Sequence, residues 1–482
     1  MALCVWFEGV TNFFQSTHNK ATSVRQSQRS IRSSVKSSLP ISFTDEALTA
    51  HGGLVLIERF LRESGWLRRI RDVFADREFD NDYSSWRMTL LALGLVIVGG
   101  TRIAHLAHLG CDPLFLRFAQ VQALPSARTL SRWLATLTAG FRDRLQELMR
   151  DVAYSTWGSV GAARITLDVD GTVIRTGESA EGAERGFHPH HPKDPSFYPL
   201  TAQLAQTGQL LGIWNRPGNT HDSVGAVDRL RELIEDARQR SGGVPIEVRM
   251  DAAFCQRPVL ELLAASGVEY ALRLPMWDWL NVRERISARK QWKRITKSVD
   301  GFSMQVRIPK WERSERVVVF RKRISGKPAR DFQLDLFQPD DGYFEYSMVA
   351  TNKTVDERSI WYFMAGRGGH EHTIGELKSG LAFASVVAQD WDANCAWQIL
   401  NGLAHNLLHD FQVRAGIATP KKNSRKRTTR ARFRSIRSLR FEWIGLPARL
   451  VRPQGRSELR IAAPRHVRER IVDAARRLAN HR

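Results

Sequence analysis

The stretch Arg164-Ile-Thr-Leu-Asp-Val-Asp-Gly-Thr-Val-Ile174 decides the fold that we expect for this chain. Apolar and polar residues alternate along it, which is typical of a β-strand with one buried and one polar face. The apolar face holds Ile165, Leu167, Val169 and Val173, and the polar face holds Thr166, Asp168, Asp170 and Thr172. Because Asp is a poor strand former, two aspartates just before Gly171 indicate a functional reason for their presence.

The patterns that follow predict the order of strands in a sheet. Residues 199–205 and 209–214 are strand-like, and Gln206-Thr-Gly208 between them indicates a hairpin. Strand patterns at 244–251 and 269–274 then alternate with helical patterns, which implies parallel additions to the sheet. Three antiparallel strands followed by parallel ones are the order of a ribonuclease H-like fold. We therefore predict an α/β fold, a ribonuclease H-like mixed sheet flanked by helices.

Composition limits the partners that this chain is expected to have. Its net charge is +22, which favours a polyanion because Lys and Arg neutralise phosphates and release counterions. Apolar runs are too short to cross a bilayer, and residues 1–10 lack the positive charge of a secretory signal, so we expect no membrane partner. Four scattered cysteines without a CxxC pair argue against a disulfide framework and fit a reducing cytoplasm.

Two basic segments are candidates for contacts with nucleic acid. Arg128 and Arg132 share one face of a helix that Ser126 is expected to cap, and this helix is either the DNA-reading helix of a helix-turn-helix or an ordinary surface helix. Residues 421–440 contain ten basic residues and no acid. Their spacing predicts a helix with a phosphate-contacting face, and a disordered basic linker is the alternative; the residues of that face are Arg427, Arg430, Arg434 and Arg437.

Carboxylates from distant segments form the candidate catalytic site. Asp170 lies on the polar face of the first strand, with Asp168 two residues before it as the alternate. Asp251 lies at the carboxyl end of a predicted parallel strand, where ligands gather in open sheets; an N-cap is the alternative interpretation. Two-metal catalysis needs carboxylates that flank ions roughly 3.5–4 Å apart, and carboxylates suit Mg²⁺. On a chain this basic, the expected substrate is a phosphodiester.

The third acid is Glu371 or Glu376. In a helix, positions advance by about 100° per residue, so Arg367, Glu371 and Lys378 fall on one face beside an apolar stripe. Glu376 falls roughly 140° away and is expected to face solvent. We therefore choose Glu371 and keep Glu376 as the alternate. The prolines interleaved with His188, His190 and His191 argue against zinc binding there.

These residues resemble those of a DDE transposase of a bacterial insertion sequence, in the branch with a β subdomain inserted between the second Asp and the Glu. The signature of that branch is Tyr, two residues, Arg, three residues, Glu, six residues, Lys. Arg367, Glu371 and Lys378 match it, while Met364 stands at the Tyr position and Tyr362 lies two residues away. The segments around Asp170 and Asp251, and Gly218-Asn-Thr-His-Asp222, also resemble the family. The resemblance covers roughly residues 50 to 460.

The resemblance implies an enzyme of cut-and-paste DNA transposition and roles for its residues. Asp170, Asp251 and Glu371 would hold two Mg²⁺ ions, for which Mn²⁺ would substitute, and Arg367 and Lys378 would bind phosphates near the cleaved end. The partners would be double-stranded DNA, as element ends and target, and a second copy of the chain in a homodimer. The location would be the bacterial cytoplasm, on the nucleoid when DNA is bound. A Trp of the insertion would stack an unpaired base, and the sequence does not choose among Trp277, Trp279, Trp292 and Trp311.

We divide the chain into six segments on these patterns. They are a flexible basic tail (1–44), a helical DNA-binding region (45–160), the first part of the catalytic core (161–274), an inserted β-rich subdomain (275–349), the second part of the core with the Glu371 helix (350–415), and a basic C-terminal region (416–482). Two other functions fit parts of the pattern. One is a ribonuclease H-like nuclease without strand transfer, and the other is a transposase-derived DNA-binding protein with a dead site.

Overall fold

The structure is a computed structural model that describes residues 43–76, 83–186, 193–323, 344–421 and 428–480. Contacts divide the chain into two units, Met1–Glu46 and Ala47–Arg482, and every element given below lies in the second. Most of the predicted tail, residues 1–42, lies outside the described residues, as do His188, His190 and His191.

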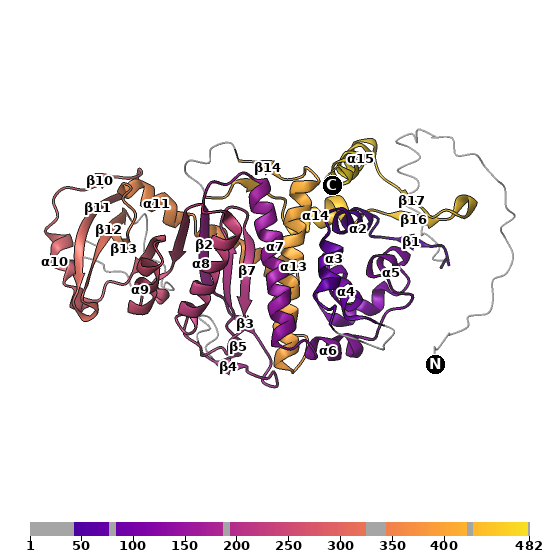
Figure 1. The fold of residues 1–482 in the computed structure, drawn as a ribbon, viewed down its shortest axis with the longest axis horizontal. Helices are drawn as coiled ribbons and strands as arrows, with labels where there is room; N and C mark the ends of the chain where they lie inside the picture. Colours follow the sequence, from indigo (N-terminus) through magenta and orange to yellow (C-terminus); the bar gives the residue numbers. More distant parts are fainter. Residues whose placement is uncertain (1–42, 77–82, 187–192, 324–343, 422–427, 481–482) are drawn as a thin grey trace, which may run out of the picture. The chain divides into compact units, whose positions relative to one another are not determined.

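The described residues contain a nine-stranded mixed sheet with the order β10-β11-β12-β13-β9-β8-β2-β6-β7 (Figure 1). Its strands are β2 (Ile165–Gly171), β6 (Leu200–Leu204), β7 (Gln209–Trp214), β8 (Ile246–Met250), β9 (Glu269–Leu274), β10 (Lys293–Arg294), β11 (Val299–Ile308), β12 (Arg313–Arg323) and β13 (Phe344–Thr351). A smaller sheet of order β3-β5-β4 follows β2 in the chain. Its strands are β3 (Ile174–Arg175), β4 (Glu184–Arg185) and β5 (Pro195–Phe197).

Five strands of the large sheet have the ribonuclease H-like order. β2 pairs antiparallel with β6, and β6 pairs antiparallel with β7. On the other side of β2, β8 and then β9 are added in parallel. The predicted fold class is therefore confirmed. The predicted hairpin is also present, and Gly208 in its turn has φ of 70°, a conformation that glycine adopts without steric cost.

The two faces of β2 differ as the alternation predicted. Ile165, Leu167 and Val169 are buried in a hydrophobic core with residues of α8 (Ala226–Ser241) and α9 (Arg257–Ala265). The opposite face is polar and buried, and there the Thr166 hydroxyl donates to Glu247 at 2.8 Å. This polar face is the one that carries Asp168 and Asp170.

The strands of the insertion continue the same sheet. β11, β12 and β13 form an antiparallel series, and β13 pairs antiparallel with β9. Main-chain pairing therefore joins the insertion directly to the strand beside β8. Short helices accompany these strands: η3 (Asp278–Leu280), α10 (Val282–Ser287) and η4 (Pro309–Trp311).

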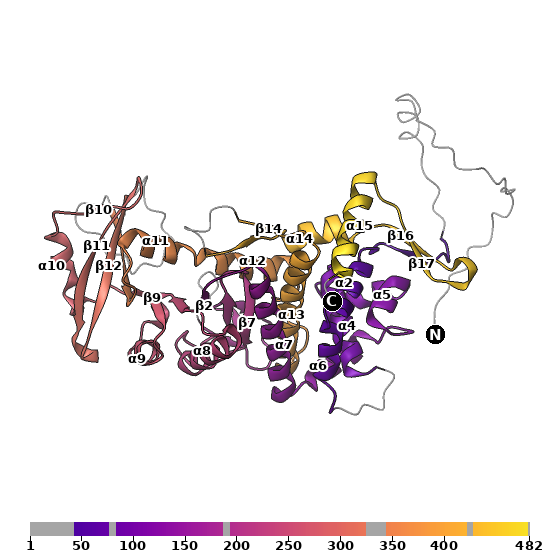
Figure 2. The same ribbon diagram turned by 45° about the horizontal axis from the view of Figure 1, so that its top comes forward.

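Two long helices, α7 (Ala139–Ser159) and α13 (Trp391–Arg414), pack against each other and against β7 (Figures 1 and 2). The buried Asn406 amide fixes this packing. Its oxygen accepts from the Leu210 backbone N–H at 2.8 Å, and its nitrogen donates to the carbonyls of Leu210 at 2.7 Å and Met149 at 2.9 Å. One side chain of α13 thus binds both its neighbouring strand and its neighbouring helix.

Helices also dominate the part of the chain before α7. They are α2 (Leu54–Glu63), α3 (Trp66–Asp72), α4 (Ser85–Val98), η1 (Ile103–Leu109), α5 (Pro113–Ala119) and α6 (Ala127–Ala135). The predicted cap is confirmed, because the Ser126 hydroxyl accepts from the Thr129 backbone N–H at 3.1 Å. No single described helix has the length and apolarity to span a membrane; only the bent pair α4 and η1 meets that test jointly.

The C-terminal region folds against the beginning of the helical region (Figure 2). β1 (Leu48–Thr49) pairs with β16 (Ala448–Val451), which pairs with β17 (Glu458–Ile461), and α15 (Arg465–Ala479) packs on α2. The approach is closest at Gly53, where a Cβ would lie 1.7 Å from the Trp443 carbonyl oxygen. Any side chain at this position would therefore separate the two segments.

The predicted helix through Arg427, Arg430, Arg434 and Arg437 is wrong for the residues that the structure describes. Arg427 lies outside them, β15 (Ala431–Arg432) pairs with β14 (Thr419–Pro420), and only α14 (Ile436–Leu439) is an α-helix, followed by a π-helical turn, η6 (Arg440–Ile444). These arginines have helical spacing, but they do not lie on one helix, because residues 431–432 pair as a strand with residues 419–420.

Two helices follow β13 in the chain. The first is α11 (Glu357–Ala365), and the second is α12 (Gly368–Gly380), which begins directly after Arg367.

A buried ion pair joins β2 to β8 and reaches α11. Asp168 and Arg249 are register partners, and both side chains are fully buried. The Arg249 guanidinium donates to the Asp168 carboxylate at 2.6 and 2.7 Å and to the Phe363 carbonyl at 2.6 Å. Gly366 leaves the space for it, since a Cβ there would lie 2.1 Å from Arg249 Nη1. The position of the α11 end therefore depends on this guanidinium.

We predict that Arg249→Met lowers the free energy of unfolding by about 3–5 kcal/mol, because the Asp168 carboxylate would stay buried without a counter-charge. Denaturant unfolding measures the loss. Arg257→Met is the matched control, since the Arg257–Glu261 pair is exposed and solvent-exposed pairs contribute little to stability. Equal losses in the two variants would contradict the role assigned to the buried pair.

Candidate active site

Asp170 and Asp251 lie at the same edge of the sheet. Asp170 is near the carboxyl end of β2, and Asp251 directly follows β8. β2 and β8 are adjacent and parallel, so residues at their carboxyl ends come together. The predicted position of both acids beside one another thus follows from strand order alone.

Arg367 bridges the two carboxylates. Its Nη2 lies 2.8 Å from Asp170 Oδ2, and its Nη1 lies 3.3 Å from Asp251 Oδ1. Arg367 is the residue before α12 and already has helical angles, with φ of −60° and ψ of −28°. A second cation, Arg273, lies 3.5 Å from Asp251 Oδ1. One guanidinium therefore occupies the space between the carboxylates that end β2 and follow β8.

The two carboxyl groups differ in their electrostatics. Burial raises the pKa of Asp170 to about 7; Arg367 opposes this shift, and the carboxylates of Asp251 and Asp222 add to it. Burial also acts to raise the pKa of Asp251, but the charges of Arg367 and Arg273 outweigh it and the pKa lies below its ordinary value. The site is thus a half-buried cluster of acids that its own arginines do not fully neutralise.

Glu371 lies on the helix face that meets the end of β2. It is one turn after Arg367, which binds Asp170, and two turns before Lys378, whose Nζ donates to the Val173 carbonyl at 2.7 Å. Burial lowers the pKa of Lys378. The Glu371 side chain itself is exposed. On the same helix face, Arg367 therefore contacts β2 itself, and Lys378 contacts a residue just after β2.

Asp168 and Glu376 have other surroundings. Asp168 is held by Arg249 inside the sheet, so it is already neutralised. Glu376 does not face solvent as predicted, because α13 packs over that side of α12: Glu376 Oε2 lies 3.5 Å from His405 Nε2 and 3.7 Å from His409 Nε2. The Glu376 Oε1 atom accepts from the Ile436 backbone N–H at 2.7 Å.

Asp222 is a further acid near Asp170 that the sequence analysis did not select. The Tyr198 hydroxyl donates to its Oδ2 at 3.0 Å, and Arg216 Nη2 lies 3.4 Å from its Oδ1. Gly171 permits this arrangement, since a Cβ there would lie 2.2 Å from Asp222 Oδ1. The signal in the sequence was the Gly218-Asn-Thr-His-Asp222 block, which ends on this residue.

His370 supports the backbone at Asp170 from α12. The Thr201 hydroxyl donates to the Asp170 carbonyl at 3.0 Å, so it accepts from His370 Nε2, also at 3.0 Å. Burial lowers the pKa of His370 to about 4, so the imidazole is neutral near pH 7. α12 is thereby bound to β6 and β2 directly beneath the carboxylates.

The chemistry of the site fits divalent cations. Its donors are carboxylate oxygens, which hard cations such as Mg²⁺ prefer. Asp251 Oδ1 is buried without a hydrogen-bond partner, and the space between it and Asp170 already holds a positive group, Arg367. Asp170 and Asp251 are therefore placed to share a cation.

Arg128 and Arg132 lie apart from these acids in the fold. Both are exposed on α6, which packs on η1, α4 and α13. The structure therefore brings Asp170, Asp251 and Arg367 together, with Lys378 beside the same strand end, and leaves the two arginines of α6 on a separate helix.

Comparison with known proteins gives the family. The family model described as "Transposase DDE domain group 1" matches residues 32–482. The chain belongs to this DDE transposase family. Among solved structures, the transposase is similar to a piggyBac transposase synaptic complex with hairpin DNA, at 11% identity and a TM-score of 0.41, with 89% of this chain and 88% of that chain covered. No curated protein matches this transposase.

We predict that Asp170→Asn makes the stability of the chelator-treated transposase less dependent on pH. In the wild type the folded state keeps a proton on Asp170 up to about pH 7, whereas the unfolded chain loses it near 3.8. The folded state therefore binds more protons in this window, and the free energy of unfolding falls as pH rises through it.

The variant lacks this loss, so it should be the more stable protein at about pH 8, by at most about 4 kcal/mol, and should lose the advantage near pH 4. Thermal unfolding of both proteins across this range measures the difference. A difference that does not change with pH would contradict the raised pKa.

Proposed function

We propose that this chain is a cut-and-paste transposase of a bacterial insertion sequence that binds terminal inverted repeats, cleaves the DNA strand and joins the freed 3′-OH end to target DNA. The observation that carries the proposal is the contact of one arginine, Arg367, with both Asp170 and Asp251 in a DDE family member. A site of acids beside basic groups suits a phosphodiester, because the acids hold cations and the basic groups hold phosphate oxygens.

Asp170, Asp251 and Glu371 would hold two Mg²⁺ ions, for which Mn²⁺ would substitute. When bound, such ions activate an attacking oxygen and stabilise the leaving oxygen. Asp251 contributes Oδ1, a buried oxygen that now forms ion pairs with Arg367 and Arg273, and Asp170 contributes a carboxylate whose burial favours a cationic partner. Glu371 lies on the helix face that both neighbours use to reach β2.

Arg367 and Lys378 would bind the phosphates of the DNA end. The planar guanidinium can donate two parallel hydrogen bonds to phosphate, and the ammonium supplies a point charge two to three turns further along α12. Both groups already lie at the end of β2, with Arg367 on Asp170 and Lys378 on the Val173 carbonyl. A DNA strand that reaches the carboxylates would therefore contact both Arg367 and Lys378.

Double-stranded DNA would bind as element ends and as target, in keeping with the net charge of +22. Two ends need two active sites, so we propose a homodimer on DNA. Such a protein would work in the cytoplasm, on the nucleoid when DNA is bound.

Two tryptophans of the insertion lie beside the segment that follows Asp251. Trp277 and Trp311 line a cavity of about 700 Å³ together with Ala252, the residue after Asp251. Trp292 instead packs edge-to-face on Phe302 at 4.8 Å. We propose that a base displaced from the duplex stacks on Trp277 or Trp311, since an aromatic face accepts any base.

We predict that Glu371→Gln lowers DNA cleavage at least about 100-fold, as Asp170→Asn and Asp251→Asn do, because each change removes a metal-binding carboxylate. The assay combines the protein, DNA bearing an element end, target DNA and Mg²⁺. Glu469→Gln on α15, an exposed residue away from the site, is the matched control and should keep wild-type activity.

The products distinguish the candidate functions. Joined products support transposition, whereas cut products alone indicate a nuclease without strand transfer. A wild-type protein that binds DNA without cutting it would be a regulator with a dead site. Full activity of Glu371→Gln would overturn the choice of the third acid.

Arg128 and Arg132 test the proposed DNA contact of α6. If both contact phosphates, the double variant Arg128→Ala, Arg132→Ala should lower the slope of log affinity against log salt by about 2, with weaker binding to all sequences. Arg229→Ala, Arg231→Ala is the matched control, because these exposed arginines of α8 are already paired with Glu232 and Asp228. An unchanged slope would indicate an ordinary surface helix.

A further inference from the structure

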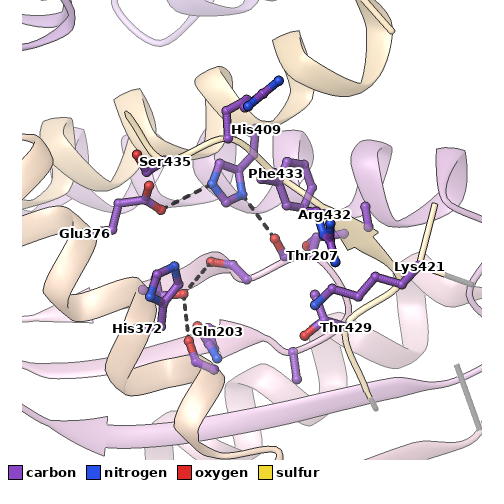
Figure 3. A pocket seen from close by; sticks show the side chains of 16 residues that line it. Gln203, Thr207, His372, Glu376, His409, Lys421, Thr429, Arg432, Phe433 and Ser435 are labelled. Carbon is purple, nitrogen blue, oxygen red and sulfur yellow. Dashed lines mark hydrogen bonds and ion pairs between the residues drawn. The ribbon is translucent and has the colours of Figure 1, made fainter. Parts of the chain in front are cut away.

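Glu376, His405 and His409 form a second cluster of metal-binding side chains, on the side of α12 away from Glu371. One ligand atom from each residue lies within 4.8 Å of the others. His405 and His409 are one turn apart on α13, so their imidazoles point the same way, with ring centroids 4.2 Å apart. Glu376 faces both histidines from α12, and Figure 3 shows it opposite His409.

Three of the four histidine ring nitrogens in this cluster have no hydrogen-bond partner. His405 is fully buried, and both of its ring nitrogens lack a partner, as does His409 Nε2. His409 Nδ1 lies 3.1 Å from the Thr207 carbonyl, which can only accept, so this nitrogen carries the proton (Figure 3). In the neutral ring the His409 Nε2 lone pair then points at the Glu376 carboxylate, which is unfavourable unless a proton or a metal ion lies between them.

The groups around the cluster hold the ligands as a metal site requires. Glu376 uses Oε1 to accept from the Ile436 backbone N–H, which leaves Oε2 toward the imidazoles. Thr207 fixes the tautomer of His409, and Phe433 stacks on its ring at a centroid distance of 4.1 Å. Orientation of ligands by a second layer of hydrogen bonds is typical of metal sites.

We propose that Glu376, His405 and His409 bind a Zn²⁺ ion, distinct from the ions of the carboxylate site. Two imidazole nitrogens and one carboxylate oxygen suit zinc, whereas Mg²⁺ prefers oxygen alone. The site opens on a cavity of about 360 Å³, lined in part by His372, Thr373 and Arg432, which leaves room for water as the fourth ligand.

The zinc ion would hold α12 in place. It would join α12 to α13, and through Glu376 to the segment that begins α14. Arg367, Glu371 and Lys378 all belong to α12 or directly precede it. Zinc would therefore stabilise the orientation of α12, which carries Glu371, without contacting the DNA strand that reacts.

Metal content of the full chain tests the site without any measurement of DNA cleavage. Protein stripped with a chelator is titrated with Zn²⁺ and, separately, with Mg²⁺, and bound metal is measured after gel filtration. We expect about one Zn²⁺ per chain, a higher unfolding temperature with Zn²⁺, and a Co²⁺ derivative with the absorption of a tetrahedral site. No retained zinc in the wild type would overturn the proposal.

Variants locate the ion. Glu376→Gln and His409→Gln should each lower the affinity for Zn²⁺ more than about 100-fold, the upper range for loss of a supporting residue alone. His466→Gln, an exposed histidine on α15, is the matched control and should bind as the wild type does, and so should His372→Gln, because water is the fourth ligand. The triple variant His188→Ala, His190→Ala, His191→Ala tests whether this other group of histidines binds the zinc ion instead.

Zinc lost in the triple variant and kept in Glu376→Gln would overturn the assignment. If Glu376→Gln does not fold, the triple variant and His372→Gln still decide, because zinc retained at about one per chain in both leaves the Glu376 cluster as its site. The result is independent of the proposed function: DNA joining can fail in a protein that binds zinc as described, and the reverse.

Discussion

The buried pair of Asp168 and Arg249 is the interaction on which the active site depends. It lies between two adjacent parallel strands, and its guanidinium also donates to the carbonyl of Phe363 at the end of α11. Four residues later the chain places Arg367 between the carboxylates of Asp170 and Asp251. A charge taken out of water must be paired and hydrogen-bonded. If the α11–α12 junction moved away from the sheet, the buried Arg249 guanidinium would lose its hydrogen bond to the Phe363 carbonyl.

The same strand therefore uses two aspartates in different ways. Asp168 is neutralised within the sheet and fixes geometry, whereas Asp170, two residues nearer the edge, keeps a carboxylate that its neighbours only partly compensate. Gly171 follows because Asp222 and Tyr198 approach the strand where a side chain would stand. Residues that look equivalent in the alternation of β2 thus differ through their depth in the fold.

Local patterns predicted the parts of the structure that local physics controls. The alternation at 164–174, the hairpin at Gly208 and the cap at Ser126 gave the strand order and the helix start, and strand order alone brought Asp170 and Asp251 to one edge. The phase of α12 puts Glu371 on the helix face of Arg367 and Lys378, and its choice as the third acid stays a prediction. Local patterns do not predict contacts between distant segments. The sequence near Glu376 does not indicate that His405 and His409 cover it, and the sequence near Arg430 does not indicate that β15 pairs with β14. Asp222 was visible as part of a motif, but its approach to Asp170 depends on Gly171 and Tyr198.

The contact between Gly53 and Trp443 has a consequence for synthesis of the protein. The helical region begins with β1 and α2, yet the partners of these elements, β16 and α15, follow them only after the whole catalytic core has been synthesised. N-terminal regions generally fold first during translation, but here α2 keeps part of its apolar surface uncovered until α15 has been added. A product that ends before β16 would thus keep this surface of α2 exposed and the edge of β1 unpaired, which favours aggregation.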